Sequence, residues 1–207
     1  MHRATPTVSH QILAELQRLG RLSACITQNV DALHERAGHQ DVLHLHGRIE
    51  EVICLDCDAL SPRSEIQKQI EALNPDLPKF HDSVSQVRPD GDIDLDGHLQ
   101  RNFKVPSCPV CDGLLKPNVV FFGGHLQSNV KAAATQAIES SSALLAIGSS
   151  LQVFSGFRLC RLAADLGLPV ILLNPGKSRA DPLATHRINE RSDAALPLIL
   201  REIQHGA

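Results

Sequence analysis

The chain has 207 residues, which suits one large domain or one domain with a smaller module. Its net charge of −3 offers no basic excess for bare nucleic acid, and aromatic residues, at 3%, are too few for base-stacking platforms. No apolar run approaches the roughly 18 residues of a transmembrane helix, so no membrane partner is expected. The first residues resemble neither a signal nor a transit peptide. Cytoplasm is therefore the expected location, and a mitochondrial one would need a leader.

Apolar residues at helical spacing predict an amphipathic helix over residues 8–19, which Gly20 is expected to end. The run LSACIT predicts a buried strand over residues 22–27. Later in the chain the pattern predicts helices over 129–141, 154–167 and 193–204, and strands over 143–148 and 169–174. Asp193 is a candidate N-cap for the last helix. Strands that alternate with helices predict an α/β fold, a Rossmann-like parallel sheet with helices on both faces.

Residues 51–116 interrupt this alternation with cysteine pairs and a long polar stretch. We therefore expect three parts along the chain. Residues 1–50 form the first Rossmann-like part, residues 51–116 a small inserted module with an acidic insertion, and residues 117–207 the second Rossmann-like part.

Four of the six cysteines form two C-x-x-C pairs, Cys54/Cys57 and Cys108/Cys111. Four thiolates at this spacing can close a tetrahedral shell around one structural zinc ion, which would replace a core that the module is too short to build. The pairs are farther apart than the roughly 15–20 residues of a simple ribbon, and the insertion accounts for this. Redox dithiols are the alternative, but two pairs together favour zinc. Cys25 and Cys160 are expected to be ordinary buried thiols.

The stretch containing Asp92, Asp94, Asp96 and Gly97 begins like a calcium-binding loop. Its twelfth position should be Glu but is Phe103, so a solvated acidic loop is the better interpretation.

The segment ITQNVDALHERAGHQDVLHLHG places polar residues and two histidines directly after a predicted strand. His44 and His46 are two residues apart and would share one face of a strand. Histidine is the usual base near pH 7, so His46 is a candidate general base and His44 a structural residue. A structural role for His46 and an H-x-H metal pair are the alternatives, although no third metal ligand lies nearby in the sequence.

The sequence AIGSSLQVFSG predicts a strand, a turn and a helix, although the chain has no G-x-G motif. The turn, formed by Gly148, Ser149 and Ser150, can donate backbone and hydroxyl hydrogen bonds to a phosphate. Asn174 ends the next predicted strand, at the edge of the sheet where ligands bind in α/β folds. There it would either bond a ribose or cap the turn.

Taken together, TQNVDALHERAG, LHLHG, the two cysteine pairs, KPNVVFFGG, GSSLQV and LLNPG occur in an order that resembles the sirtuins, NAD-dependent protein deacylases. The resemblance extends from about residue 8 to residue 200. The insertion, CLDC and GSSLQVFSG look most similar to the class II branch, which includes the mitochondrial lipoamidase-type sirtuin.

The resemblance implies NAD and one structural zinc as cofactors, and acyl-lysine proteins or peptides as partners. It implies that His46 is the base acting on a ribose hydroxyl and that Asn29 is the second catalytic residue. The implied NAD-binding residues are Gln28, Asn29, Val30, Asp31, Gly148, Ser149, Ser150, Asn174, Asp193 and Ala194. The implied substrate-binding residues are Val120, Phe122, Gly123, Gln152 and Val153, which would hold the peptide as an added strand.

Two departures from the family pattern affect these expectations. Nothing in the chain matches the family's glycine-rich GAGxS loop and Asp-x-Arg motif, which supply a central strand and the diphosphate cradle. FFGG also replaces an acidic-ended motif, and Gly124 has no carboxylate. We therefore expect the chain as given to lack deacylase activity. The alternative function is a catalytically silent zinc module that binds acyl-lysine peptides or a protein partner.

Overall fold

The structure is a computed structural model that describes residues 4–75 and 103–205. It contains two compact units, and each is described by itself. The larger comprises Met1–Arg48 and Val119–Ala207, and the smaller comprises Ile49–Asn118. The calcium-like stretch at 92–97 lies outside the described residues.

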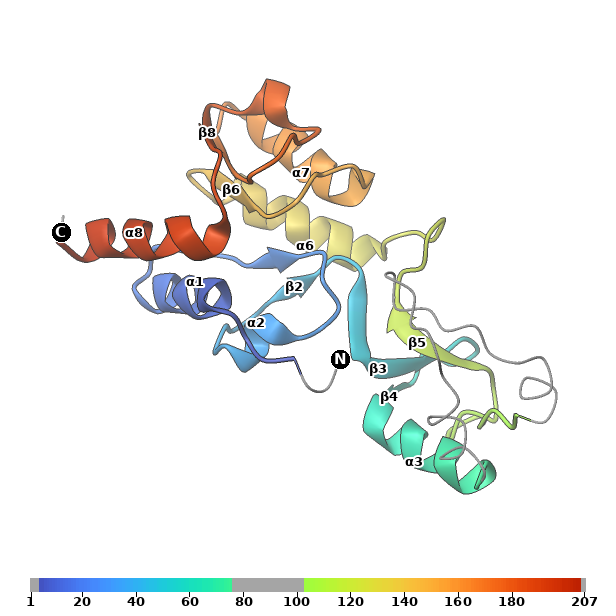
Figure 1. The fold of residues 1–207 in the computed structure, drawn as a ribbon. Coiled ribbons are helices and arrows are strands. Elements are labelled where there is room, and N and C mark those ends of the chain that lie inside the picture. The colour runs from blue at the N-terminus through green and yellow to red at the C-terminus, as the bar shows by residue number, and fades with distance from the viewer. Residues whose placement is uncertain (1–3, 76–102, 206–207) are drawn as a thin grey trace. The chain divides into compact units, whose positions relative to one another are not determined.

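The larger unit contains two parallel sheets (Figure 1). In the first, β1 (Ile26–Thr27) pairs with β2 (Leu43–His44). In the second, β7 (Val170–Leu173) lies between β6 (Leu144–Ile147) and β8 (His186–Ile188). The predicted α/β class with parallel strands is confirmed. Within each sheet the carboxyl ends of the strands lie at one edge, which is where ligands bind in folds of this type.

The helices of this unit include the four that the sequence predicts, one near its start and three in its second half, together with the short helix α2. They are α1 (Val8–Arg18), α2 (Leu33–Arg36), α6 (Ser128–Glu139), α7 (Phe154–Asp165) and α8 (Ser192–His205). Gly20 and Gly167, which follow α1 and α7, have φ angles of 68° and 72°, a left-handed conformation suited to glycine. Asp193 is not the N-cap that we expected. It lies inside α8, and its carboxylate accepts two hydrogen bonds from the Arg191 guanidinium instead. None of the helices in residues 4–75 and 103–205 combines the length and the apolar character that crossing a bilayer requires.

Strand β7 separates two apolar layers because successive side chains of a strand point to opposite faces. Val170 and Leu172 belong to the layer formed with α6 and α7. Leu173 belongs to the layer formed with α1 and α8. Helices therefore cover both faces of this sheet, as Figure 1 shows.

Leu196 of α8 is fully buried in the second layer, at 0% exposure, next to Leu173. We expect Leu196→Ala to lower the free energy of unfolding by about 2–5 kcal/mol, because it removes buried methyl groups and leaves a cavity. Urea denaturation followed by circular dichroism measures this. Leu198→Ala, on the exposed side of the same helix at 57% exposure, is the matched control and should change stability by no more than about 0.5 kcal/mol. Equal losses in both variants would contradict the assignment of this layer.

The strand predicted over residues 22–27 is shorter than expected, since β1 contains only Ile26 and Thr27. Its register explains the length, because β1 pairs only with the two-residue β2. The flanking hydrogen bonds run from Leu43 N–H to the Cys25 carbonyl and from Leu45 N–H to the Thr27 carbonyl.

The smaller unit contains a three-stranded sheet in the order β4-β3-β5 and one described helix. The strands are β3 (Gly47–Cys54), β4 (Leu60–Pro62) and β5 (Leu115–Val119), and the helix is α3 (Arg63–Leu73). Strands β3 and β4 are antiparallel, with Val52 opposite Ser61. The Asn74 side chain bonds the backbone of Lys104 through both its amide nitrogen and its oxygen, each at 2.8 Å.

Candidate active site and zinc centre

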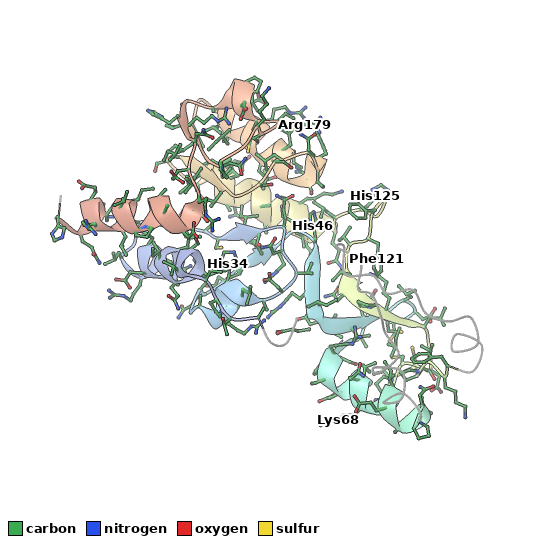
Figure 2. All side chains as sticks on the ribbon, in the orientation of Figure 1. His34, His46, Lys68, Phe121, His125 and Arg179 are labelled. Atoms are coloured by element: carbon green, nitrogen blue, oxygen red, sulfur yellow. The ribbon has the colours of Figure 1, made fainter. Side chains whose placement is uncertain are left out.

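His46 lies in the turn between β2 and β3, and Figure 2 labels it. Its Nδ1 lies 3.0 Å from the Gln28 carbonyl oxygen. Its Nε2 lies 2.8 Å from Ser155 Oγ. A carbonyl oxygen can only accept, so in the neutral ring Nδ1 carries the proton and the Ser155 hydroxyl donates to Nε2. The ring is thus held in the tautomer whose Nε2 lone pair can accept a proton, as a general base requires.

Gln28 lies between His46 and the turn after β6. Its carbonyl accepts from His46, and its side-chain Nε2 donates to Ser149 Oγ at 3.3 Å. Gly156 of α7 contacts the same side chain, since a Cβ added at this glycine would lie 2.7 Å from Gln28 Nε2. Gln28 therefore connects residues that are more than a hundred positions apart in the chain.

The turn formed by Gly148, Ser149 and Ser150 follows the carboxyl end of β6 and precedes α7. Gly148 has a φ of 60°, and no heavy atom lies within 4 Å of a Cβ built on it. Ser149 Oγ also accepts a hydrogen bond from Leu151 N–H at 3.1 Å. The open space beside Gly148, with hydroxyl groups next to it, fits the phosphate and ribose part of a dinucleotide.

Asn174 follows β7 at the same edge of the sheet as Gly148, whose N–H bonds the Leu173 carbonyl. Its side-chain amide donates to the Gly176 carbonyl at 2.9 Å, as a residue that caps a turn would. Both sequence-based interpretations of Asn174 therefore remain open, because its side-chain oxygen is a further acceptor. Asp193 and Ala194 lie in the first turn of α8.

The residues that follow Gln28 after β1 differ in their burial and in their hydrogen bonds. Asn29 has an exposed side chain, and its N–H donates to Thr27 Oγ1. Asp31 Oδ1 accepts from Leu33 N–H at 3.0 Å, at the start of α2, so this carboxylate has a structural role as well. Val30 is partly buried between them.

Two loops contain the predicted substrate-binding residues, and neither loop is a strand. Val120 N–H donates to the His46 carbonyl at 2.9 Å, which connects the first loop to the candidate base. In the same loop Phe122 is fully exposed and Gly123 has a φ of 83°. In the second loop Gln152 and Val153 are exposed, and the Gln152 carbonyl accepts from the Arg179 guanidinium at 3.2 Å. The exposed residues of both loops are compatible with an added peptide strand.

His44 has different neighbours from His46, although the two are close in sequence. Its Nε2 is bonded to the Glu35 carboxylate, and its side chain is 9% exposed. Arg48 lies 3.4 Å from the same carboxylate. His44 thus connects β2 to α2, and in the described residues it makes no hydrogen bond to Gln28 or Ser155.

Sequence reasoning missed two residues at this edge, Ser155 and Arg179. Ser155 contacts His46 across 109 positions of the chain, so no local pattern could have predicted the pair. Arg179 N–H donates to the Ser150 carbonyl, and its guanidinium lies 4.3 Å from the centroid of the Phe157 ring. Arg179 is labelled in Figure 2, and its basic side chain in the loop after β7 was the only feature of the sequence that could have indicated it.

The contact between Gly156 and Gln28 leads to a prediction. Gly156→Ala is expected to displace the Gln28 amide from Ser149 and to weaken NAD binding by several fold. Stability should stay the same or rise by about 0.5–1 kcal/mol, since alanine is favoured over glycine within a helix. Calorimetry with NAD and thermal unfolding measure the two effects. If the mechanism is right, Gly156→Ala should have no further effect on binding in a Gln28→Ala background.

The four paired cysteines meet in the smaller unit, with their sulfur atoms within 4.8 Å of one another. Cys54 Sγ lies 3.6 Å from Cys111 Sγ, and Cys57 Sγ lies 3.8 Å from Cys108 Sγ. A disulfide would require about 2.05 Å. Thiolates at about 2.3 Å from a tetrahedral zinc ion lie about 3.8 Å apart, so the observed spacing fits zinc.

The backbone around each pair supports thiolate ligands. Asp56 N–H points to Cys54 Sγ and Val110 N–H points to Cys108 Sγ, both at 3.4 Å. The Val110 N–H is the main cause that lowers the pKa of the Cys108 thiol to about 7, which favours its thiolate form. Gly113 follows the second pair, and a Cβ there would lie 2.2 Å from the Asp56 carboxylate, so only glycine fits. Cys54, Cys57, Cys108 and Cys111 would hold the ion with no open position, as in structural sites.

Comparison with known proteins identifies the family to which the chain belongs. The family profile described as "SIR2: Sir2 family" matches residues 1–155. The chain belongs to the Sir2 family. The sirtuin resemblance inferred from the sequence is thereby confirmed, while the class II and lipoamidase-type assignments stay predictions.

Two relatives illustrate how far the similarity of this sirtuin chain extends. It is 43% identical over 198 residues to "NAD-dependent protein deacetylase 2" of Bradyrhizobium diazoefficiens, covering 96% of the chain and 71% of the relative. It is also 43% identical over 204 residues to "NAD-dependent protein deacylase SIR4" of Monosiga brevicollis, covering 96% of the chain and 66% of the relative.

Solved sirtuin structures are similar over the whole chain. One described as "Sir2-p53 peptide-NAD+" has a TM-score of 0.75 and 28% identity, with 99% of this sirtuin chain and 71% of the other covered. Another, described as "Sir2 bound to acetylated peptide", has the same TM-score and identity and covers 99% and 72% of the two chains.

Proposed function

We propose that this sirtuin chain is an NAD-dependent protein-lysine deacylase that transfers the acyl group of an acyl-lysine to ADP-ribose and releases nicotinamide. The observation that supports this most directly is the orientation of His46. Its Nδ1 is fixed by the Gln28 carbonyl and its Nε2 is directed to a hydroxyl. Membership of the Sir2 family and the names of the relatives, which are NAD-dependent deacetylases and deacylases, support the same function over a catalytically silent module.

When bound, NAD supplies the ribose carbon that accepts the acyl oxygen and the leaving nicotinamide. The residues of this chain position the dinucleotide and remove a proton from a ribose hydroxyl. The Gly148–Ser150 turn offers donors to phosphate and ribose, and Gln28 connects that turn to the base. His46 Nε2 accepts the proton of a ribose hydroxyl, and the Gln28 carbonyl stabilises the charged ring through the Nδ1 proton. The Ser155 hydroxyl lies at His46 Nε2, the nitrogen that would accept the proton.

Acyl-lysine proteins or peptides are the proposed partners. The exposed loop residues 121–124 and 152–153 support this, since each loop could offer backbone to an extended peptide. Zinc would have no part in the chemistry, because four thiolates complete its shell and leave no site for substrate.

Nicotinamide release from NAD in the presence of an acetyl-lysine peptide tests the proposal. It should be measured with the 207-residue chain and with the same chain preceded by the glycine-rich segment of a relative. We expect peptide-dependent release from the second protein, and none from the 207-residue chain alone, in which no residues match the glycine-rich loop. If both proteins fold and neither releases nicotinamide with any acyl-lysine peptide, the proposed function is wrong.

A further inference from the structure

The larger unit contains a second group of side chains of metal-ligating types, whereas the four-cysteine centre belongs to the smaller unit. Cys25, His34 and His39 each offer one ligand atom, and these atoms lie within 4.8 Å of one another. Cys25 directly precedes β1, His34 lies in α2, and His39 follows that helix. Figure 2 labels His34, which lies where α1 and α2 contact each other. We had expected Cys25 to be an ordinary buried thiol, and the proposed deacylation uses none of the three.

The spacing within this group matches metal coordination. Cys25 Sγ lies 3.6 Å from His34 Nδ1. A thiolate at about 2.3 Å and an imidazole nitrogen at about 2.0–2.1 Å from a tetrahedral zinc ion lie about 3.6 Å apart. The His39 ring stands edge-on to the His34 ring, with centroids 5.2 Å apart and planes at 75°.

The buried ring of His39 is independent evidence that this group binds a ligand. It is only 5% exposed, and neither of its ring nitrogens has a hydrogen-bond partner in the described residues. Leaving a buried polar group unpaired costs about 1–3 kcal/mol, so such groups need an explanation. Neighbouring His10 differs, because its Nδ1 lies 2.8 Å from the Thr7 hydroxyl. A metal ion bound among the three side chains would occupy the lone pair that His39 directs into the group.

We propose that Cys25, His34 and His39 bind one divalent transition-metal ion, with zinc as the expected ion and water as its fourth ligand. One thiolate and two imidazoles form a ligand set that suits zinc and related ions and does not suit magnesium or calcium. Burial raises the pKa of the Cys25 thiol to about 11, so its proton leaves when the metal forms the bond to sulfur. Burial, followed by the neighbouring His10 and His39, lowers the pKa of His34 to about 4, which leaves this ring neutral.

A metal ion at this site would constrain the chain between Cys25 and His39. Cys25 and His39 lie on either side of the segment that contains Gln28, Asn29 and Asp31. An ion bound to both ends would close this segment into a loop of fixed span. The metal site is thus separate from the proposed reaction but adjacent to residues expected to hold NAD.

Titration of the 207-residue chain with Zn²⁺ tests the proposal, with bound metal counted after gel filtration. We expect two equivalents in the unaltered chain, one at the four-cysteine centre and one at the new site. Cys25→Ser and His39→Gln should each bind one equivalent. His125→Gln, which removes an exposed histidine outside the group, is the matched control and should still bind two.

Co²⁺ provides a second readout, because each thiolate ligand contributes to a sulfur-to-cobalt charge-transfer band. Cys25→Ser should remove only the part of this band that the second equivalent adds to that of the four-cysteine centre. If Cys25→Ser or His39→Gln fails to fold, His34→Gln replaces it, with folding checked by circular dichroism. A single equivalent in the unaltered chain would overturn the proposal and would mean that water satisfies His39. A second equivalent that binds Cys25→Ser and His39→Gln as tightly as the unaltered chain would also overturn it.

Discussion

Replacing His46 by alanine is expected to lower deacylation by about 10²–10⁴-fold, the usual contribution of a general base. The loss should appear in turnover, because His46 contacts the Gln28 carbonyl and the Ser155 hydroxyl rather than the Gly148–Ser150 turn. The measurement is acyl transfer and nicotinamide release at saturating NAD, in a chain preceded by the glycine-rich segment. NAD affinity, measured by calorimetry, should change by less than a few fold.

His44→Ala is the matched control for this experiment. His44 is bonded to Glu35 and makes no hydrogen bond to Gln28 or Ser155 in residues 4–75 and 103–205, so turnover should largely remain. Stability should fall instead, because the partly buried Glu35 carboxylate loses a partner. Normal turnover in His46→Ala together with an inactive His44→Ala would reverse the assignment of the two histidines.

Replacing Cys54 by serine is expected to remove one equivalent of zinc per chain and to unfold the smaller unit. Its described core is small, with Val52, Ile66 and Pro106 the buried apolar side chains besides Cys54 and Cys108. Metal binding supplies about 10–16 kcal/mol in comparable structural sites, more than such a core can replace. Metal analysis gives the zinc content, and limited proteolysis shows cleavage within Ile49–Asn118.

Cys160→Ala is the control for thiol loss, since Cys160 is buried in α7 of the other unit. It should leave the zinc content unchanged. A chelator strong enough to strip the ion should reproduce the Cys54→Ser cleavage pattern in the unaltered chain. Unchanged zinc content in Cys54→Ser would show that the four cysteines do not form a metal site.

The sequence predicted those helices and strands that are defined by a local pattern of apolar residues and by glycines at their ends. Helices α1, α7 and α8 have apolar residues at helical spacing, and Gly20 and Gly167 mark two of their ends. It missed β8, since His186 and Arg187 give this exposed strand no apolar pattern and its pairing with β7 is what defines it. It also missed α3, although Ile66, Ile70 and Leu73 recur at helical spacing there.

The candidate site was predictable to the extent that its residues lie at the ends of predicted strands. Gln28, Gly148 and Asn174 follow β1, β6 and β7, so their place at the carboxyl edges follows from parallel strands. Ser155 and Arg179 were not predictable, because their contacts depend on how distant segments pack. The cluster of Cys25, His34 and His39 was not seen for the same reason, since nothing in its spacing matches a known metal motif.

Strand β7 is shared by both apolar layers of the larger unit, through Leu172 on one face and Leu173 on the other. Neither layer can open without exposing one face of this strand, so the two layers should lose their structure together, as one cooperative unit. Asn174 directly follows Leu173, which places a residue expected to bind ribose at the end of the strand that couples them. Anything that loosens the packing of α1 against α8 should therefore also raise the mobility of the sheet edge that contains Asn174, and a dinucleotide bound there should in turn protect that helix pair.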